Sequence, residues 1–316
     1  MRGVMLDRAS LDRGDLDLTR LLTLLSGWRL HDATPPGKLD AHLDGAEVVL
    51  TNKVVLDRAT LERHRRLRLV CVLATGTDNV DLDAAAALGI TVRNVTAYGT
   101  TSVVQHLFAL MLALARRLPA QLDAVAAGDW SRSEQFCLLD QPIDDLAGKR
   151  LGIIGHGELG QAVARTGECF GMIPLIAERR GEPPRRGRLP FEQVVAKADV
   201  LSLHCPLTPQ TEKLIDATVL AAMPRHGWLI NTARGGLVDE AALANALDRG
   251  IIAAAALDVL SQEPPPPDHP LLTPPRENLI VTPHVAWAAR SARQRIIDLT
   301  CDNIEAYLEA TGTPRP

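Results

Sequence analysis

The sequence has few aromatic residues, few cysteines and little net charge. Aromatic side chains make up 3% of the 316 residues, and the formal net charge at pH 7 is −4. So small a charge gives no reason to expect nucleic acid or an anionic membrane surface as a partner. The five cysteines are an odd number, are scattered and include no C-x-x-C pair. We therefore expect a reduced, cytoplasmic setting, and we predict no metal site.

Long hydrophobic runs are also lacking. The longest apolar stretch, Val103–Ala115, is interrupted by Gln105 and His106 and is too short to span a bilayer. Residues 1–8, M-R-G-V-M-L-D-R, contain no uninterrupted apolar core, unlike a secretory signal. We therefore expect no membrane partner. An apolar content of 46% and a charged content of 23% are typical of a globular protein, and the length suits two domains.

A glycine-rich turn stands near the middle of the chain. Leu151–Ile154 is an apolar run that predicts a buried strand, and Glu158–Phe170 has apolar residues at helical spacing. Between them the sequence reads G-x-G-x-x-G, at Gly155, Gly157 and Gly160. In a dinucleotide site the first glycine permits the tight turn, the second lets the backbone approach a pyrophosphate, and the third lets the helix pack closely. The phosphates then lie at a helix N-terminus. The alternative is an ordinary tight turn between strand and helix.

An acidic residue follows the next predicted strand, which supports the dinucleotide interpretation. Ile173–Ala177 predicts that strand, and Glu178 comes directly after it, 23 positions beyond Gly155. This is near the spacing expected for a carboxylate that binds the ribose hydroxyls.

The first part of the chain predicts a parallel α/β sheet, because short β-like runs alternate there with helix-capable segments. These runs are Val4–Leu6, Glu47–Thr51, Arg68–Leu73 and Ile90–Val92.

Small-residue loops follow two of these runs. Ala74–Asp81 reads A-T-G-T-D-N-V-D, and such loops at the carboxyl ends of parallel strands bind ligands through backbone N–H groups. A simple turn with a helix cap at Asp78 or Asp81 explains the loop equally well. Asn52 and Lys53 follow the second run, so Lys53 is either an anion contact or a solvated lysine.

The middle of the chain predicts a long helix and then an irregular segment. Thr101–Leu118 is the longest convincing helix and is ended by Pro119. The segment Gly128–Gln141 contains Trp130 and Phe136. These two aromatics indicate a subunit interface or packing under a loop.

After the glycine turn, strands and helices alternate again, which predicts a doubly wound domain. The predicted strands are Val200–His204, Trp228–Thr232, Ile251–Leu257 and Leu279–Thr282, and the predicted helices are Asp216–Met223, Asp239–Arg249 and Ala288–Ala310.

Polar residues follow four of these strands, whose ends share one edge of a parallel sheet. Arginine at such an edge can bind a carboxylate through two parallel hydrogen bonds. Histidine can exchange a proton with a carbonyl oxygen, and glutamate can hold the imidazole. Arg234, Glu263 and His284 therefore suit carbonyl reduction beside a dinucleotide. Taken one at a time, Arg234 is equally consistent with a helix cap, Glu263 with a loop carboxylate and His284 with a partly buried histidine.

Five motifs together resemble the D-isomer-specific 2-hydroxyacid dehydrogenases, and the match covers nearly the whole chain. Within the family, the sequences of these motifs are most similar to those of the glycerate dehydrogenases, also called hydroxypyruvate reductases. The motifs are G-H-G-E-L-G, H-C-P-L-T, N-T-A-R-G-G-L-V-D-E, A-A-L-D-V-L-S-Q-E-P and T-P-H-V-A-W.

The resemblance implies an oxidoreductase that transfers a hydride between NAD(H) and a small D-2-hydroxy or 2-keto acid. Arg234 would bind the substrate, and Glu263 would pair with His284, the acid/base residue. The expected substrate-binding residues are Lys53, Ala74, Thr75 and Gly76. The expected cofactor-binding residues are Gly155, His156, Gly157, Glu158, Leu159, Gly160, Glu178, Arg179, His204, Cys205, Pro206, Thr211, Thr232, Ala233, Asp258 and Ala286, with Asp258 holding the nicotinamide carboxamide.

The resemblance also implies two doubly wound parallel-sheet domains. A flavodoxin-like substrate domain would comprise residues 1–98 and 286–316, and a Rossmann NAD-binding domain residues 99–285. A homodimer would be built on residues near 100–145.

Three features depart from the family pattern. Ala286 replaces a frequent glycine, and Gln105 replaces a glutamate. Arg179 and Arg180 follow Glu178, with Arg185, Arg186 and Arg188 nearby. An acid at Glu178 favours NAD because it repels a 2′-phosphate, whereas an adjacent arginine can bind that phosphate and favour NADP. The basic loop can also be merely solvated. We expect NAD.

Other activities remain open from sequence. A nucleotide-sensing corepressor of the same fold can keep the three residues Arg234, Glu263 and His284, but this chain has no tails or low-complexity extensions. Formate oxidation typically pairs the histidine with glutamine, which Glu263 is not. Phosphoglycerate oxidation is possible too, although no long C-terminal regulatory extension is expected here.

Overall fold

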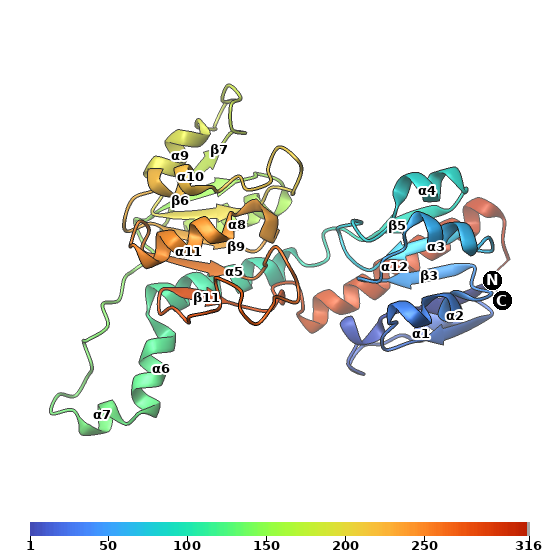
Figure 1. Cartoon of the computed structure of the whole chain (residues 1–316), viewed down its shortest axis with the longest axis horizontal. Coiled ribbons are helices and arrows are strands. Elements are labelled where there is room, and N and C mark those ends of the chain that lie inside the picture. The colour runs from blue at the N-terminus through green and yellow to red at the C-terminus, as the bar shows by residue number, and fades with distance from the viewer. Residues whose placement is uncertain (315–316) are drawn as a thin grey trace. The chain divides into compact units, whose positions relative to one another are not determined.

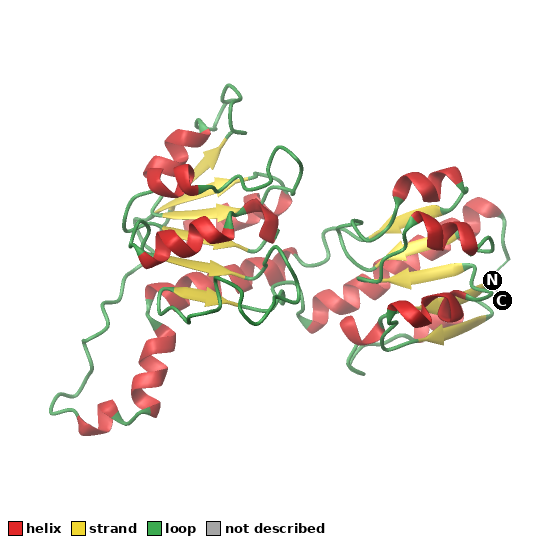
Figure 2. Cartoon of the chain, viewed as in Figure 1, coloured by secondary structure: helices red, strands yellow, loops and turns green. Residues whose placement is uncertain are grey.

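The chain folds into two compact α/β units. In the computed structural model, which describes residues 1–314, the first unit comprises Met1–Gly99 and the residues from Trp287 onwards, and the second comprises Thr100–Ala286. These bounds differ by one residue from the domain boundaries expected at 98/99 and 285/286. Each unit has one sheet of parallel strands with helices on both faces (Figures 1 and 2). The fold class expected from the sequence is therefore confirmed.

The sheet of the first unit has five parallel strands in the order β2-β1-β3-β4-β5. This is the flavodoxin-like order, in which the strand order reverses between β1 and β3 and ligands bind beyond the carboxyl ends of those strands. The strands are β1 (Arg2–Met5), β2 (Gly27–Leu30), β3 (Val48–Thr51), β4 (Leu69–Val72) and β5 (Thr91–Asn94).

Helices cover both faces of this sheet, and each face has its own apolar core. The helices α1 and α12 share one core with side chains such as Leu50 and Leu69, while α2, α3 and α4 share the other with Val49 and Val70. Successive residues of a strand point to opposite faces, so β3 and β4 supply both cores. The helices are η1 (Arg8–Ser10), α1 (Thr19–Thr23), η2 (Pro36–Lys38), α2 (Leu39–Leu43), α3 (Arg58–Arg63), α4 (Leu82–Ala87) and α12 (Arg290–Thr311).

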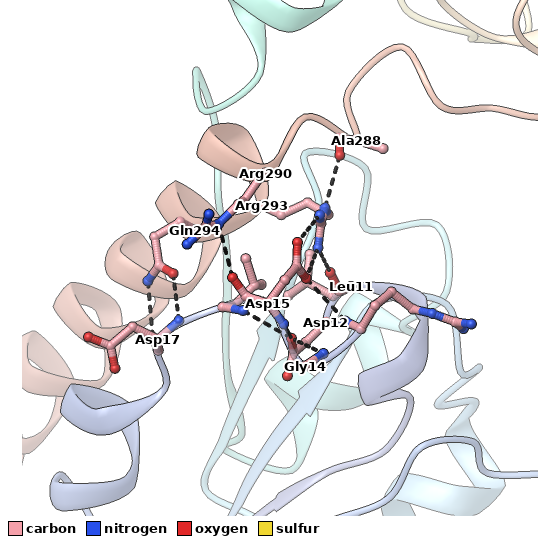
Figure 3. Close-up of polar contacts among 11 residues, drawn as sticks. Leu11, Asp12, Gly14, Asp15, Asp17, Ala288, Arg290, Arg293 and Gln294 are labelled. Carbon is pink, nitrogen blue, oxygen red and sulfur yellow. Dashed lines mark hydrogen bonds and ion pairs between the residues drawn. The ribbon is translucent and has the colours of Figure 1, made fainter.

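Polar contacts join the first turn of α12 to the loop after η1 (Figure 3). Arg293 donates from both terminal nitrogens to the two carboxylate oxygens of Asp15, at 2.8 and 2.7 Å, and also donates to the carbonyl of Leu11. Gln294 exchanges two hydrogen bonds with the backbone of Asp17. The bond with Arg293 lowers the pKa of Asp15 to about 2. The last helix is thus tied to the first part of the chain by charge as well as by packing.

The sheet of the second unit has six parallel strands in the order β11-β10-β9-β8-β6-β7. The strand order reverses between β6 and β8, and the crevice at such a reversal is where open α/β sheets bind ligands. The His204 N–H donates to the Ile154 carbonyl at 2.7 Å and joins the carboxyl ends of these two strands. The strands are β6 (Arg150–Ile154), β7 (Ile173–Ala177), β8 (Val200–Leu203), β9 (Trp228–Asn231), β10 (Ala254–Leu257) and β11 (Leu279–Val281).

Two sets of helices cover this second sheet. The helices α9, α10 and α11 pack on one face, and α5 and α8 pack on the other. β10 shows the alternation, since Ala255 and Leu257 belong to the first core and Ala254 and Ala256 to the second. The helices are α5 (Thr100–Ala115), α6 (Leu118–Ala126), α7 (Asp129–Arg132), α8 (Glu158–Cys169), α9 (Phe191–Lys197), α10 (Ala217–Ala222), η3 (Gly235–Leu237) and α11 (Glu240–Asp248).

The helices α6 and α7 and the loop after them form an arm, residues 118–145, that leads away from the second sheet (green in Figure 1). No residue of α6 is buried. In residues 1–314 no single helix is long and apolar enough to cross a membrane. Among these residues, only α5 and α6 taken together have the length and apolar composition of a membrane span, and the two helices meet at a bend of 62°.

Three details of the sequence interpretation were wrong. The expected helix Thr101–Leu118 ends at Ala115, and Pro119 lies in the first turn of α6, where proline is tolerated because its missing N–H needs no partner there. The longest described helix is α12, with 22 residues. The strand β2 was not expected, because G-W-R-L lies at the sheet edge and is only partly buried.

Candidate active site

The glycine turn adopts the geometry that a dinucleotide site requires. Gly155 has a φ of +95°, and a Cβ built on it would lie 2.5 Å from the backbone of His204 and Cys205. A Cβ on Gly160 would lie 2.0 Å from the Gly155 carbonyl oxygen, whereas one on Gly157 would meet nothing within 4 Å. The outer two glycines therefore allow tight packing, and the middle one leaves the N-terminus of α8 open to a ligand.

Two buried polar atoms near this turn have no hydrogen-bond partner within residues 1–314. They are His204 Nδ1, after β8, and Thr232 Oγ1, after the neighbouring strand β9. Burial lowers the pKa of His204 to about 3, so its ring is neutral at pH 7. A buried polar atom without a partner costs about 1–3 kcal/mol. A dinucleotide bound at the ends of β8 and β9 would supply hydrogen-bond partners for these two atoms, so the residues present fit such a cofactor.

Glu178 follows β7, as expected, but its carboxylate is held by arginine. The Arg185 guanidinium donates to both oxygens at 2.6 and 2.5 Å, and Arg188 lies 3.4 Å away. The backbone N–H of Arg179 also donates to Glu178. The bond with Arg185 holds the pKa of this carboxyl well below its usual range. Glu178 is 3% exposed, and a cavity of about 370 Å³ lies against it.

The buried carboxylate of Asp258 binds the loop that follows β11. Its two oxygens accept the backbone N–H groups of Val285 and Ala286, at 3.0 and 2.8 Å, and its carbonyl accepts the N–H of His284. The Thr282 hydroxyl donates to the same carboxylate at 2.5 Å. These bonds hold His284 at a φ of +54°, a conformation that is uncommon for any residue other than glycine.

Glu263 and His284 form a direct pair. Glu263 Oε2 lies 2.6 Å from His284 Nδ1. The other oxygen, Oε1, accepts the backbone N–H of Leu260 at 3.0 Å. Glu263 is therefore fixed at both carboxylate oxygens, which orients the imidazole of His284.

Arg234 lies close to this pair through the backbone. A Cβ built on Gly235 would lie 1.9 Å from the carbonyl carbon of Leu260, so the segment after β9 rests directly on the segment that carries Glu263. The Arg234 side chain donates to the Ala233 carbonyl at 2.8 Å, and Asn231 donates to the Arg234 carbonyl at 2.9 Å. Three adjacent strands, β9, β10 and β11, thus bring a guanidinium, a carboxylate and an imidazole to one edge of the sheet.

The chain is similar to known dehydrogenases in sequence. A family model described as "D-isomer specific 2-hydroxyacid dehydrogenase, NAD binding domain" matches residues 108–286. The chain is 44% identical to the glycerate dehydrogenase of Methylorubrum extorquens, over 96% of each chain. It is 35% identical to the hydroxypyruvate reductase of Blautia hydrogenotrophica, over 99% of this chain and 98% of that one.

A solved structure is similar over nearly the full length. The NADPH-dependent glyoxylate/hydroxypyruvate reductase of Sinorhizobium meliloti, in complex with NADP and malonate, has a TM-score of 0.81 and 30% identity. The alignment covers 97% of this chain and 93% of that one.

The chain belongs to the D-isomer-specific 2-hydroxyacid dehydrogenase family. The family resemblance and the enzyme class expected from the sequence are confirmed. The protein is an oxidoreductase of small hydroxy and keto acids, and it uses a nicotinamide cofactor.

Several cofactor residues expected of this dehydrogenase have protein partners of their own. The Glu158 carboxylate accepts a hydrogen bond from the Thr100 hydroxyl at 2.7 Å. The Thr211 hydroxyl donates to the Pro206 carbonyl at 2.7 Å and accepts the Thr208 N–H. Thr211 therefore braces the loop after β8. His156, Leu159 and Cys205 lie near the glycine turn in sequence or space, and their contact with a cofactor stays a prediction.

The substrate residues expected in the first unit lie at the carboxyl ends of its adjacent strands β3 and β4. Lys53 is exposed, and its backbone N–H donates at 2.6 Å to Asp7, a buried carboxylate after β1. Burial raises the pKa of Asp7. The Thr75 carbonyl accepts a hydrogen bond from Asn94. Of the two expected caps for the helix after this loop, Asp81 is confirmed, since it accepts the Ala84 N–H. The substrate role of Lys53, Ala74, Thr75 and Gly76 stays a prediction.

The sequence interpretation missed the residues that brace the site. Besides Thr282, these include His106, whose Nε2 lies 2.9 Å from the Thr282 hydroxyl and 3.4 Å from Asp258. A histidine inside an apolar helix was the available signal. Within residues 1–314 no group of three or more His, Cys, Asp or Glu side chains is placed to hold a metal ion.

Proposed function

We propose that this dehydrogenase interconverts D-glycerate and hydroxypyruvate and also reduces glyoxylate. The observation that carries the proposal is the 2.6 Å contact between Glu263 and His284 at the edge that also holds Arg234. The names of its relatives, glycerate dehydrogenase and hydroxypyruvate reductase, support the substrate class.

His284 is the proposed acid and base. A bound nicotinamide supplies or accepts the hydride at the substrate carbon. In reduction, protonated His284 gives its proton to the keto oxygen, and in oxidation neutral His284 takes it back. Because Nδ1 contacts Glu263, we assign the exchanged proton to Nε2. The Glu263 carboxylate keeps the ring in one orientation throughout.

Arg234 is the proposed substrate anchor. Its planar guanidinium can bind a carboxylate through two parallel hydrogen bonds. Lys53 and the backbone N–H groups of Ala74, Thr75 and Gly76 are proposed as further contacts to the substrate, which makes the first unit the substrate domain.

NAD(H) is the proposed cofactor. A carboxylate at the end of β7, Glu178, accepts ribose hydroxyls and repels a 2′-phosphate. NADP(H) is the second candidate, because Arg185 pairs with Glu178 and neutralises the charge that would repel that phosphate. Binding of NAD(H) through Glu178 therefore requires Arg185 to turn away from it.

Initial rates test the proposal directly. NADH and NADPH oxidation would be measured separately with hydroxypyruvate, glyoxylate and pyruvate. Rapid turnover of hydroxypyruvate with NADH is expected, and the ratio of the two cofactors decides between them. Intact nucleotide binding without turnover of any keto acid would refute the proposed function.

His284→Gln tests the acid/base role. The variant should lose about 10²–10⁴-fold in turnover, the contribution typical of a general acid or base. NADH binding, followed by fluorescence, should be retained. Turnover equal to that of the unchanged protein would refute the assignment.

A homodimer built on the arm is proposed as the assembled form. Trp130 and Phe136, which packing under a loop would have buried, are 53% and 88% exposed. With Leu118, Leu122 and Val125 of α6 also exposed, the arm presents more apolar surface than a solitary subunit usually does. A second copy of this chain is the proposed partner, since two-fold homodimers are the commonest assembly.

A cytoplasmic location is proposed as well. All five cysteines are free, and free thiols are typical of a reducing compartment.

A further inference from the structure

The loop that carries Glu263 has no regular structure of its own. Residues 258–278, between β10 and β11, form no helix or strand. Glu263 nevertheless has to stay 2.6 Å from His284. Its second oxygen is bound by the Leu260 N–H, so the position of the carboxylate depends on the backbone at residues 260–261.

The side chain of Glu240 holds that backbone. Glu240 is the first residue of α11. Its Oε1 accepts the backbone N–H of Ser261 at 2.7 Å, and its Oε2 accepts the Ser261 hydroxyl. Ser261 is two residues from Glu263. Hydrogen bonds to a carboxylate are stronger than those between neutral groups, so Glu240 is a firm anchor for this segment.

His269 adds a third bond to the same carboxylate. Its Nε2 lies 3.2 Å from Glu240 Oε2. The backbone N–H of Leu271 donates to His269 Nδ1 at 3.3 Å, so Nδ1 is an acceptor and the proton of the neutral ring is on Nε2. The ring is 5% exposed. Glu240 therefore binds the loop at two places, before and after Glu263.

The same helix holds the far end of the loop by a separate ion pair. Asp248, the last residue of α11, binds the Arg276 guanidinium at 2.6 and 2.9 Å. Arg276 is 13 residues from Glu263 and precedes β11. The two ends of α11 thus carry comparable anchors, and only the one at Glu240 lies next to Glu263.

We propose that Glu240 is a positioning residue for the pair of Glu263 and His284. It acts through Ser261 and Leu260 on the Glu263 carboxylate and does not itself contact substrate or cofactor. The proposal rests on the proposed function for the roles of Glu263 and His284.

The kinetic test compares Glu240→Gln with Asp248→Asn. Glutamine has nearly the same size but loses the charge, and its amide faces the His269 N–H donor. Glu240→Gln should lower kcat for hydroxypyruvate about 10- to 100-fold, as displacements of about 1 Å do, and should leave NADH binding within twofold. Asp248→Asn removes an anchor of the same helix and loop, and its kcat should stay within twofold while its Tm falls.

A double variant separates positioning from general damage. If Glu240 acts through Glu263, adding Glu240→Gln to Glu263→Gln should lower kcat no further. Multiplied losses in the double variant, an unchanged kcat in Glu240→Gln, or an equal kcat loss in Asp248→Asn would each overturn the proposal.

A crystal structure of each single variant gives a readout that does not need turnover. The contact between Glu263 Oε2 and His284 Nδ1 should lengthen beyond hydrogen-bonding distance in Glu240→Gln and remain at 2.6 Å in Asp248→Asn. An unchanged contact in Glu240→Gln would overturn the positioning role. A wild-type protein that turns over no keto acid would instead refute the proposed function, and the distance would still decide the role of Glu240.

Discussion

Replacing Gly235 by alanine adds a single methyl group, but it should displace the residues at the sheet edge that holds Arg234, Glu263 and His284. The new Cβ would lie 1.9 Å from the Leu260 carbonyl carbon, 2.2 Å from its oxygen and 2.3 Å from the Ser261 nitrogen. These are backbone atoms and cannot rotate away. Since carbon atoms in contact are ordinarily about 3.5–4.0 Å apart, relieving the 1.9 Å contact requires the two segments to separate by roughly 1.6–2.1 Å.

That separation moves catalytic residues apart. Gly235 follows Arg234, and the Leu260 N–H holds Glu263. A misplacement of 1 Å can cost about 100-fold in rate, so kcat for hydroxypyruvate should fall about 100-fold or more. Overpacking of this kind also destabilises a protein by about 1–3 kcal/mol. Steady-state kinetics, NADH binding by fluorescence and thermal unfolding measure the three effects.

The neighbouring glycine is a matched control. A Cβ on Gly236 would meet only side-chain carbons of Leu207, the nearest at 2.9 Å, and Leu207 is exposed and able to move. Gly236→Ala should therefore lose much less activity than Gly235→Ala. A Gly235→Ala variant with wild-type kcat and stability would refute the argument from close packing.

Three further predictions concern cofactor choice, acid stability and assembly. Arg185→Gln should release the Glu178 carboxylate and lower KM for NADH about tenfold, because hydrogen bonds to charged groups are worth one to two orders of magnitude in an equilibrium constant. Arg186→Gln is the control. An unchanged ratio of kcat/KM for NADH to kcat/KM for NADPH in Arg185→Gln would contradict this role of Arg185. Asp15 has a lowered pKa in the folded protein, so its pairing with Arg293 stabilises above about pH 4 and is lost as the pH falls towards 2. Denaturant midpoints measured across that range should fall more steeply for the wild-type protein than for Arg293→Gln, and equal slopes would argue against the pair. Phe136→Asp should shift the mass measured by light scattering from two chains towards one, and a mass of one chain for the unchanged protein would exclude the dimer.

The sequence predicted the parallel strands and the glycine turn well because they depend on local pattern. An apolar run that ends in glycine needs no distant partner to be recognised, and Ile173–Ala177 matched β7 at both ends. Other expected runs differ from the strands at their ends. Val200–His204, Trp228–Thr232 and Leu279–Thr282 each extend one residue too far, to a polar residue that follows the strand. Ile251–Leu257 begins three residues before β10. The edge strand β2 had no apolar run to reveal it.

Contacts between distant residues were not accessible in the same way. The family resemblance suggested Glu263 and His284 as partners, but nothing in the sequence connects Glu240 with Ser261 and His269. Arg185 is seven residues from Glu178, and the pattern of charges did not distinguish a solvated arginine from one that covers the carboxylate. Such pairings depend on loop paths, which composition and periodicity do not specify.

The interrupted first unit has a consequence for how the chain is made. Its sheet is complete once residues 1–99 have been synthesised, but α12, which covers one face through side chains such as Ile296 and Ile304, comes about 190 residues later. At roughly 5–20 residues per second, the ribosome needs ~10–40 s to supply it. The second unit is continuous in sequence and can fold in that interval. The nascent first unit therefore exposes an apolar face while the second unit folds. That face is the part of the chain that a holding chaperone would have to protect.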